Sequence, residues 1–220
     1  MTELSELEAP VRTAIAELLA DPIFEMIPMK NALEQARHLS PGSRISVTAS
    51  PNKTLDDSLD LAGDLVDMGF RVTPHLSARM TRGFDHLAHL LERIDRLGIT
   101  TAFVVGGDPE PAGPFDDGLS LLEAMEEIGH SLEVGVPCYP EGHAVIPDDA
   151  LDEALQRKQR HATWMTSQMC FDGEAVMRWT ESARQAGISL PLVLGLPGVA
   201  DRMKLLRIST RIGVGRSLSF

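Results

Sequence analysis

The sequence predicts an α/β protein, and within that class a (β/α)8 TIM barrel that lacks its eighth strand. Three observations lead to this prediction. Short apolar runs alternate with amphipathic stretches of helical length, glycines stand where helices would end, and seven such units follow one another without a dividing linker. The 220 residues are therefore expected to form a single barrel domain.

Seven apolar runs are the candidate strands, and each has the length of a buried strand in a parallel sheet. They cover residues 23–28, 45–49, 71–76, 102–106, 133–138, 164–169 and 190–196. A segment at about residues 10–20 precedes the first run and is expected to form a helix that caps the bottom of the barrel. Because a full barrel has eight strands and typically ~250 residues, we expect the eighth strand to be missing from the C-terminal end.

The segments between the runs have one apolar and one charged face, as helices on a barrel do. Leu55, Leu59 and Ala62 recur at helical spacing after the second run, and the segment after the third run repeats the pattern. Four glycines stand just before the next run, where a left-handed residue commonly ends a helix. They are Gly69, Gly98, Gly129 and Gly187.

A doubly wound open sheet is the alternative architecture, because it also alternates strands with helices. Its dinucleotide-binding form has a glycine-rich loop after the first strand. Pro28, Met29 and Lys30 stand at that place in this chain. The barrel is therefore the favoured fold.

The chain is acidic, with a formal net charge of -12 at pH 7. This charge would repel a phosphate backbone, and no stripe of Lys and Arg offsets it, so small molecules are expected as partners and nucleic acid is not. No run of about 18 apolar residues and no secretion signal is present, which favours a cytoplasmic protein with no membrane partner. Cys138 and Cys170 lie in apolar segments and fit a reducing compartment.

In a parallel barrel the active site lies at the C-terminal ends of the strands, and few polar residues stand there. Glu25 lies inside an apolar run, where a carboxylate is costly unless it faces a polar cavity or a partner. Such a setting raises the pKa of a carboxyl group and suits general acid chemistry, although a structural ion pair would also explain it. Asp108 follows two glycines that let a ligand approach the backbone, but Gly-Asp-Pro is also a common turn.

Histidines stand at two strand ends and on one helix. His75 and His143, with Asp108, could bind a metal ion. No clustered ligand set accompanies them, so we expect hydrogen bonds to a ligand or to loop backbone, and no metal. His86 and His89 lie three residues apart in a predicted helix and are expected on its solvated face.

The strand-end motifs, taken together and in order, resemble those of the methylenetetrahydrofolate reductase family over residues 24 to about 198. The most specific is Tyr139-Pro140-Glu141-Gly142-His143, which is similar to the Tyr-Pro-Glu-x-His of that family. The other similar segments are residues 24–30 (family pattern Phe-Glu-Phe-Phe-Pro-Pro-Lys), 46–48 (Ser-Val-Thr), 73–76 (Ala-Pro-His-Leu), 107–109 (Arg-Gly-Asp-x-Pro) and 168–172 (Gln-x-x-Phe-Asp).

The resemblance implies an oxidoreductase that interconverts 5,10-methylenetetrahydrofolate and 5-methyltetrahydrofolate, with NADH or NADPH as the hydride partner. Glu25 would be the general acid at folate N10, and Asp108 would stabilise the 5-iminium cation that forms when the ring opens. Gln168 would bind the pterin edge, with Glu25 and Asp108 as the other folate-binding residues. The residues implied for cofactor binding are Thr48, His75, Gly107, Tyr139, His143 and Lys158.

The chain departs from the family pattern at the flavin positions. Gly106 stands for an Arg and Asp117 for a Tyr, while Leu151 and Ala154 stand for an Asp and an Asn before Lys158. The lost charge-assisted bonds and the added acid make FAD doubtful.

Short actinobacterial-type members of the family, which are thought to work without flavin, are more similar to this chain. The similarity lies in residues 48–51, 170–172, 204–206 and 212–215. We therefore expect direct hydride transfer between nicotinamide and folate. An FAD-dependent reductase, a non-catalytic folate-binding relative and a metal-dependent hydrolase that uses His75, Asp108 and His143 are the alternatives.

Overall fold

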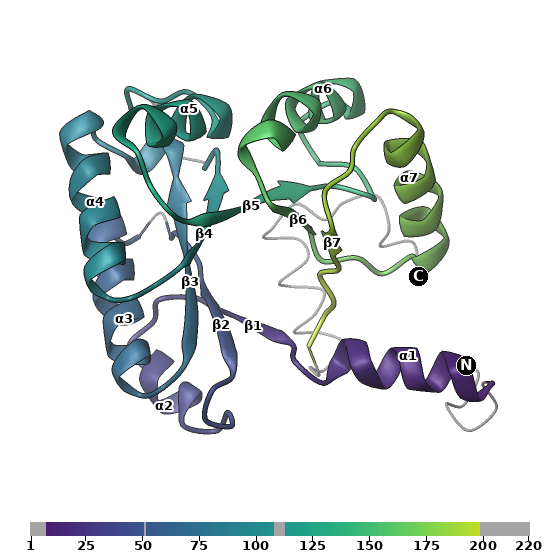
Figure 1. Ribbon diagram of the computed structural model, residues 1–220, viewed down its shortest axis with the longest axis horizontal. Helices are drawn as coiled ribbons and strands as arrows, with labels where there is room; N and C mark the ends of the chain where they lie inside the picture. Colours follow the sequence, from purple (N-terminus) through teal and green to yellow (C-terminus); the bar gives the residue numbers. More distant parts are fainter. Residues whose placement is uncertain (1–7, 51, 108–112, 199–220) are drawn as a thin grey trace. The chain divides into compact units, whose positions relative to one another are not determined.

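The computed structural model describes residues 8–50, 52–107 and 113–198. Within these residues seven strands alternate with helices and follow one another in chain order in a parallel sheet (Figure 1). The α/β barrel class expected from the sequence is confirmed as a TIM-like fold. The expectation of a missing eighth strand concerns the chain beyond residue 198, outside the described part.

The chain forms two compact units, residues 1–75 with 89–100, and residues 76–88 with 101–220. That these make one domain stays a prediction. In the first unit β1, β2 and β3 pair in parallel, and α2 packs against α3. Its elements are α1 (Ala9–Leu19), β1 (Ile23–Met26), α2 (Ala32–Ala36), β2 (Arg44–Val47), α3 (Leu55–Asp67) and most of β3 (Arg71–Ser77).

In the second unit β4 to β7 pair in parallel, and α5 packs against α6 (Figure 1). Its strands are β4 (Thr101–Val105), β5 (Glu133–Cys138), β6 (Trp164–Ser167) and β7 (Leu192–Val193). Its helical elements are η2 (Ala78–Met80), α5 (Gly118–Ile128), α6 (Asp148–Lys158), η3 (Gln159–His161) and α7 (Gly173–Gln185). Helix α4 (Phe84–Arg96) has residues in both units.

The predicted helix ends are confirmed, and for the reason expected. Gly69, Gly98, Gly129 and Gly187 all have a positive φ, a conformation that side chains with a Cβ rarely adopt. Helix α3 begins at a capping box, in which the Thr54 hydroxyl accepts from the Asp57 N–H and the Asp57 carboxylate accepts from the Thr54 N–H. Local chemistry therefore sets where these helices start and stop.

Strand β7 is shorter than the predicted run. It contains Leu192 and Val193 only, because Gly195 N donates to the Ser167 side-chain oxygen at 2.8 Å and leaves the backbone ladder. A Cβ at residue 195 would also lie 2.5 Å from the Ser167 carbonyl oxygen. The close approach of these two backbones ends the regular pairing.

The expectation for His86 is wrong. His86 is buried, and its Nδ1 accepts a hydrogen bond from the Arg82 N–H at 3.0 Å at the start of α4. His89 agrees with the expectation, since its side chain is half exposed and lies 3.9 Å from Asp56. The predicted N-terminal helix is present as α1, which has no buried residue, and its capping role stays a prediction.

No helix within residues 8–50, 52–107 and 113–198 is long and apolar enough to cross a membrane.

Candidate active site

One face of β1, β2 and β3 carries a row of polar side chains. Glu25 pairs in register with Ser46, and Ser46 pairs with Thr73. Residues in register on parallel strands point to the same face of the sheet, and so do residues two apart on one strand, so His75 joins this row. The residues between them point to the opposite face and are buried; they are Ile45, Val47, Val72, Pro74 and Leu76.

Glu25 stands at the β1 end of this row. Solvent reaches its side chain, yet the surrounding protein desolvates the carboxyl group and raises its pKa. Desolvation is the one cause of the shift, and it penalises the charged form. Compared with an ordinary Glu, the equilibrium is therefore shifted toward the protonated acid, which is the form that can give up a proton to a ligand.

His75 is held by a hydrogen bond between its Nε2 and the Ser46 Oγ, at 2.7 Å. Burial lowers the pKa of His75 to about 4, so the ring is neutral at pH 7 and can bond to a hydroxyl as either donor or acceptor. Ser46 was not among the predicted site residues. The polar and apolar alternation of Ser46, Val47 and Thr48 was the signal that could have identified it.

The loops after β2 and β4 hold three further predicted residues. Thr48 is half-buried, and its N–H donates to the Met26 carbonyl at 3.0 Å, which ties it to the end of β1. Gly107 is exposed and has a φ of +89°, a conformation that glycine adopts readily, and its role in binding stays a prediction. Asp108 lies outside the described residues.

Tyr139 and His143 follow β5 and contact each other edge to face, with ring centroids 5.2 Å apart. His143 Nδ1 accepts from the backbone N–H groups of Val145 and Ile146, at 3.3 and 3.2 Å. A nitrogen that accepts carries no proton, so in the neutral ring the proton is on Nε2. His143 therefore offers an N–H donor on the side opposite its own loop.

Gln168 follows β6, and its N–H donates to the Cys138 carbonyl at 2.9 Å. Its side-chain Oε1 accepts from the Met169 N–H at 2.7 Å, which orients the amide within its own loop. Cys138 and Cys170 are buried free thiols, as the sequence indicated. Desolvation raises the pKa of Cys138 to about 12, so this thiol stays neutral.

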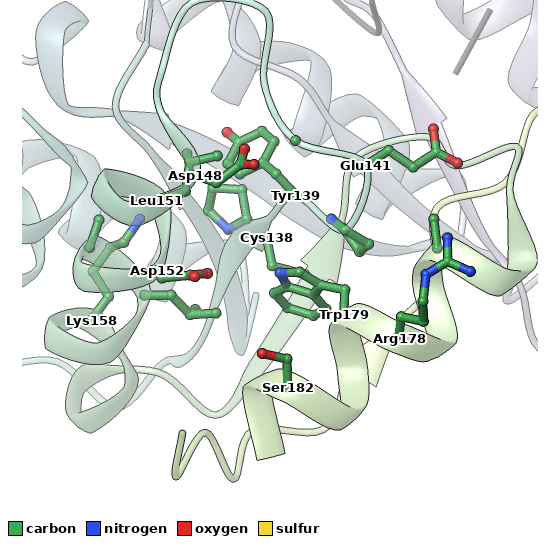
Figure 2. Close-up of a pocket in the computed structure, with 16 residues that line it drawn as sticks. Cys138, Tyr139, Glu141, Asp148, Leu151, Asp152, Lys158, Arg178, Trp179 and Ser182 are labelled. Atoms are coloured by element: carbon green, nitrogen blue, oxygen red, sulfur yellow. The ribbon is translucent and has the colours of Figure 1, made fainter. Parts of the chain in front are cut away.

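A cavity of about 510 Å³ lies between the end of β5, α6 and α7 (Figure 2). Leu151, Ala154 and Lys158 line it from α6, and so do the acids Asp148 and Asp152. Burial lowers the pKa of Lys158, although the negative charge of Asp117 opposes that shift. The pKa of Asp152 is raised by desolvation and by the like charges of two neighbouring acids. Anionic charge is therefore already crowded on the α6 side of the cavity.

The site residues form two sets. Glu25, Thr48 and His75 belong to the first unit, where Ser46 and Thr73 join them, and the predicted residues of the second unit are Gly107, Tyr139, His143, Lys158 and Gln168. In the part of the chain that the structure describes, no group of three His, Cys, Asp or Glu residues is arranged to hold a metal ion.

The sequence profile of methylenetetrahydrofolate reductase matches residues 26–214, most of the chain. The chain belongs to the methylenetetrahydrofolate reductase family. The match begins one residue after Glu25 and includes Ser46, Thr73 and His75 of the polar row, the Tyr139–His143 loop and Gln168. The resemblance seen in the strand-end motifs is thereby confirmed at the level of the family.

Two family members in eukaryotes are distant relatives of this chain. The "Probable methylenetetrahydrofolate reductase (NADPH)" of Caenorhabditis elegans is 24% identical over 196 residues, which are 81% of this chain and 29% of that protein. Methylenetetrahydrofolate reductase 1 of Schizosaccharomyces pombe is 25% identical over 118 residues, which are 48% of this chain and 19% of that protein. The chain thus spans less than a third of the length of either relative.

Solved structures of other enzymes share the fold. A protein of Burkholderia cenocepacia J2315 described as a lyase or mutase has a TM-score of 0.54 at 15% identity, covering 89% of this chain and 77% of that one. 2,3-Dimethylmalate lyase, a member of the PEP mutase/isocitrate lyase superfamily, has a TM-score of 0.54 at 12% identity, covering 96% and 84%. At such identities the similarity shows the TIM-like fold and nothing about activity.

Proposed function

We propose that this chain interconverts 5,10-methylenetetrahydrofolate and 5-methyltetrahydrofolate, with a nicotinamide dinucleotide as the direct hydride partner and without flavin. The observation that carries the proposal is Glu25, an acid with a raised pKa in a polar row at the strand ends, in a member of this family. NADH or NADPH, when bound, would donate or accept the hydride at the folate methylene carbon. The residues of the chain would supply binding, orientation and the proton.

Glu25 would act as the general acid. Opening the five-membered ring of the folate requires a proton at N10, and a carboxyl group whose pKa is raised holds that proton closer to neutral pH than an ordinary Glu does. Ser46 and neutral His75 would surround the acid with groups that bond without adding charge. A cationic neighbour would lower the pKa of Glu25 and favour loss of the proton.

Asp108 and Gln168 would act on the folate itself. A carboxylate at residue 108 would stabilise the cationic iminium that forms after ring opening, because opposite charges attract strongly where water is excluded. Gln168 would bind the pterin edge with the donor end of its amide, since its Oε1 already accepts from the Met169 N–H. Both roles follow from the positions that these residues occupy in the family motifs.

The residues on α6 do not fit the diphosphate of FAD. Leu151 and Ala154 cannot form hydrogen bonds to phosphate oxygens through their side chains, and Asp148 and Asp152 would repel them. Lys158 is a cation there, but burial already disfavours its charge. This chemistry supports the flavin-free form of the reaction.

The test is oxidation of NADH and of NADPH by purified protein with 5,10-methylenetetrahydrofolate and no added flavin. We expect turnover by a colourless protein, and a loss of at least about tenfold in rate for Glu25→Gln and for Asp108→Asn, or more than ~1.4 kcal/mol of transition-state stabilisation. A yellow protein with flavin absorption bands would favour the FAD-dependent alternative. Folate binding without turnover would favour the non-catalytic relative, and unchanged rates in both variants would remove the catalytic assignment.

A further inference from the structure

We propose that Glu141 is a positioning residue whose carboxylate braces the loop between β6 and α7, and so holds Gln168 in place. Glu141 is the middle residue of the Tyr139–His143 motif, and the reaction proposed above gives it no task. The role of Gln168 in folate binding rests on that proposed function. The claim that Glu141 holds the loop between β6 and α7 rests only on the contacts of Glu141 and does not depend on the proposed function.

Glu141 links two loops that follow neighbouring strands. It lies after β5, and its Oε1 accepts hydrogen bonds from the backbone N–H groups of Phe171 at 2.7 Å and Asp172 at 2.6 Å. Both distances are short for N–H donors, as is usual when the acceptor is a carboxylate. One side chain therefore fixes two successive peptide groups of a loop 30 residues further along the chain.

These bonds complete the N-terminus of α7. Asp172 is the N-cap residue, and its own carboxylate accepts from the N–H groups of Glu174 and Ala175 at 2.9 and 3.1 Å. The first N–H groups of a helix have no partner within the helix, and negative charge is favourable beside them. Glu141 and Asp172 together therefore accept from four N–H groups, those of residues 171, 172, 174 and 175.

The rest of the loop is held from its other side. The Gln168 N–H donates to the Cys138 carbonyl on β5, and the Cys170 N–H donates to the Gly195 carbonyl, both at 2.9 Å. Glu141 fixes the segment that follows these two bonds. Because the amide of Gln168 is oriented by the N–H of the next residue in the loop, a change in the loop backbone would turn the amide.

The Glu141 carboxylate is directed at the loop and not at the centre of the cavity. Figure 2 shows it pointing away from Trp179 and Lys158. Its second oxygen, Oε2, is buried and has no hydrogen-bond partner among the described residues. An unpaired buried oxygen is costly, and the two hydrogen bonds to Oε1 offset that cost. That geometry points to bracing of the loop.

The experiment compares Glu141→Ala, Glu141→Asp and Glu141→Gln with the parent. Ala removes the acceptor, Asp keeps the charge but is one methylene too short to reach both N–H groups, and Gln keeps an oxygen at the same reach. Glu174→Ala is the matched control, because Glu174 is an exposed acid in the first turn of α7 that does not contact the loop through its side chain. If the Glu141→Ala variant does not fold, the Glu141→Asp variant still tests the proposal.

The first measurement is amide hydrogen exchange at Phe171 and Asp172, which needs no substrate. We expect exchange about tenfold or more faster in the Ala and Asp variants, close to the parent rate in the Gln variant, and unchanged in the control. Unchanged exchange in the Ala and Asp variants would overturn the brace.

The second measurement is the dissociation constants of 5-methyltetrahydrofolate and NADH by calorimetry. We expect folate affinity to fall about tenfold in the Ala and Asp variants and to recover in the Gln variant, with NADH affinity changed by less than about twofold. Equal losses for both ligands, or unchanged folate affinity despite faster exchange, would overturn positioning of Gln168. If the parent does not bind folate, the proposed function fails, and the exchange data still decide whether Glu141 braces the loop.

Discussion

The polar row on β1, β2 and β3 has one acid beside uncharged side chains, whereas α6 lines its cavity with two acids and a lysine. Desolvation raises the pKa of Glu25 and lowers that of His75, so neither group readily takes up charge. On α6, Asp148 and Asp152 line the same cavity as Lys158, whose pKa burial lowers. The first region suits transfer of a proton, and the second is poorly suited to the diphosphate of FAD.

If the proposed function holds, the acid side and the cofactor side of the reaction depend on different elements and can change independently. The acid and its neutral neighbours depend on alternating residues of three paired strands, which the core fixes from the other face. The cofactor side depends on residues of one helix surface, where Leu151 and Ala154 cost the fold little. A change on α6 therefore leaves the strand face as it is.

The largest effect is expected for Glu25→Gln, which removes the proton and keeps the shape. General acid catalysis contributes about 10²-fold or more, so the fall in kcat/KM should exceed the tenfold minimum given above and reach about 10²-fold. In the parent, kcat/KM should fall as pH rises through the raised pKa of Glu25, since the protonated acid is the active form, and the variant should lack this limb. Glu34→Gln, an exposed acid on α2, is the control. If Glu25→Gln had the rate of the parent, Glu25 would not be the general acid, and the strand face would not be the proton-transfer region.

A smaller effect is expected in the stability of the fold below neutral pH. The pKa of His75 is about 4 in the folded chain and 6.5 in the unfolded chain, so between these values only the unfolded state binds the proton. Stability is therefore lost as pH falls from about 6.5 to 4, by at most about 3 kcal/mol from this group.

Urea unfolding at several pH values measures this dependence. The slope of stability against pH in that window should be shallower for His75→Gln than for the parent. His38→Gln, which changes an exposed histidine, should keep the parent slope. Equal slopes for all three proteins would mean that His75 is not held neutral by the fold.

The smallest effect is expected for Asp152→Asn, which removes one negative charge from the cavity. Affinity for FAD, measured by quenching of its fluorescence, should rise by no more than about threefold, because Asp148 and the apolar positions are unchanged. Asp149→Asn, which changes an acid outside the cavity lining, should have a smaller effect. Tight FAD binding by the parent would contradict the charge argument.

Much of the fold could be predicted because strand and helix signals are local. All seven apolar runs contain strands, and the glycines at residues 69, 98, 129 and 187 end helices, since a positive φ is a property of the residue itself. The length of β7 could not be predicted, because it depends on a hydrogen bond from Gly195 to a side chain on β6. The burial of His86 could not be predicted either, because it accompanies a hydrogen bond from the Arg82 N–H to the His86 ring.

The candidate site could be predicted only in part. As with the fold, the residues that were missed depend on contacts between segments far apart in the sequence. Glu25 was identifiable because a carboxylate inside an apolar run is costly wherever the chain folds. Ser46 was missed because a serine in a strand has no such cost, and its bond to His75 arises only from strand register. The brace by Glu141 joins loops 30 residues apart, a contact that periodicity does not report.

The most direct test of direct hydride transfer follows a deuterium label from the dihydronicotinamide to the folate. The protein would be incubated in ordinary water with NADH deuterated at the transferred position of C4 and with 5,10-methylenetetrahydrofolate. Direct transfer predicts one deuterium in the methyl group of nearly every molecule of 5-methyltetrahydrofolate, detected by mass spectrometry. A methyl group whose new hydrogen comes from water would contradict it, because the hydride would then have passed through a carrier that exchanges with solvent.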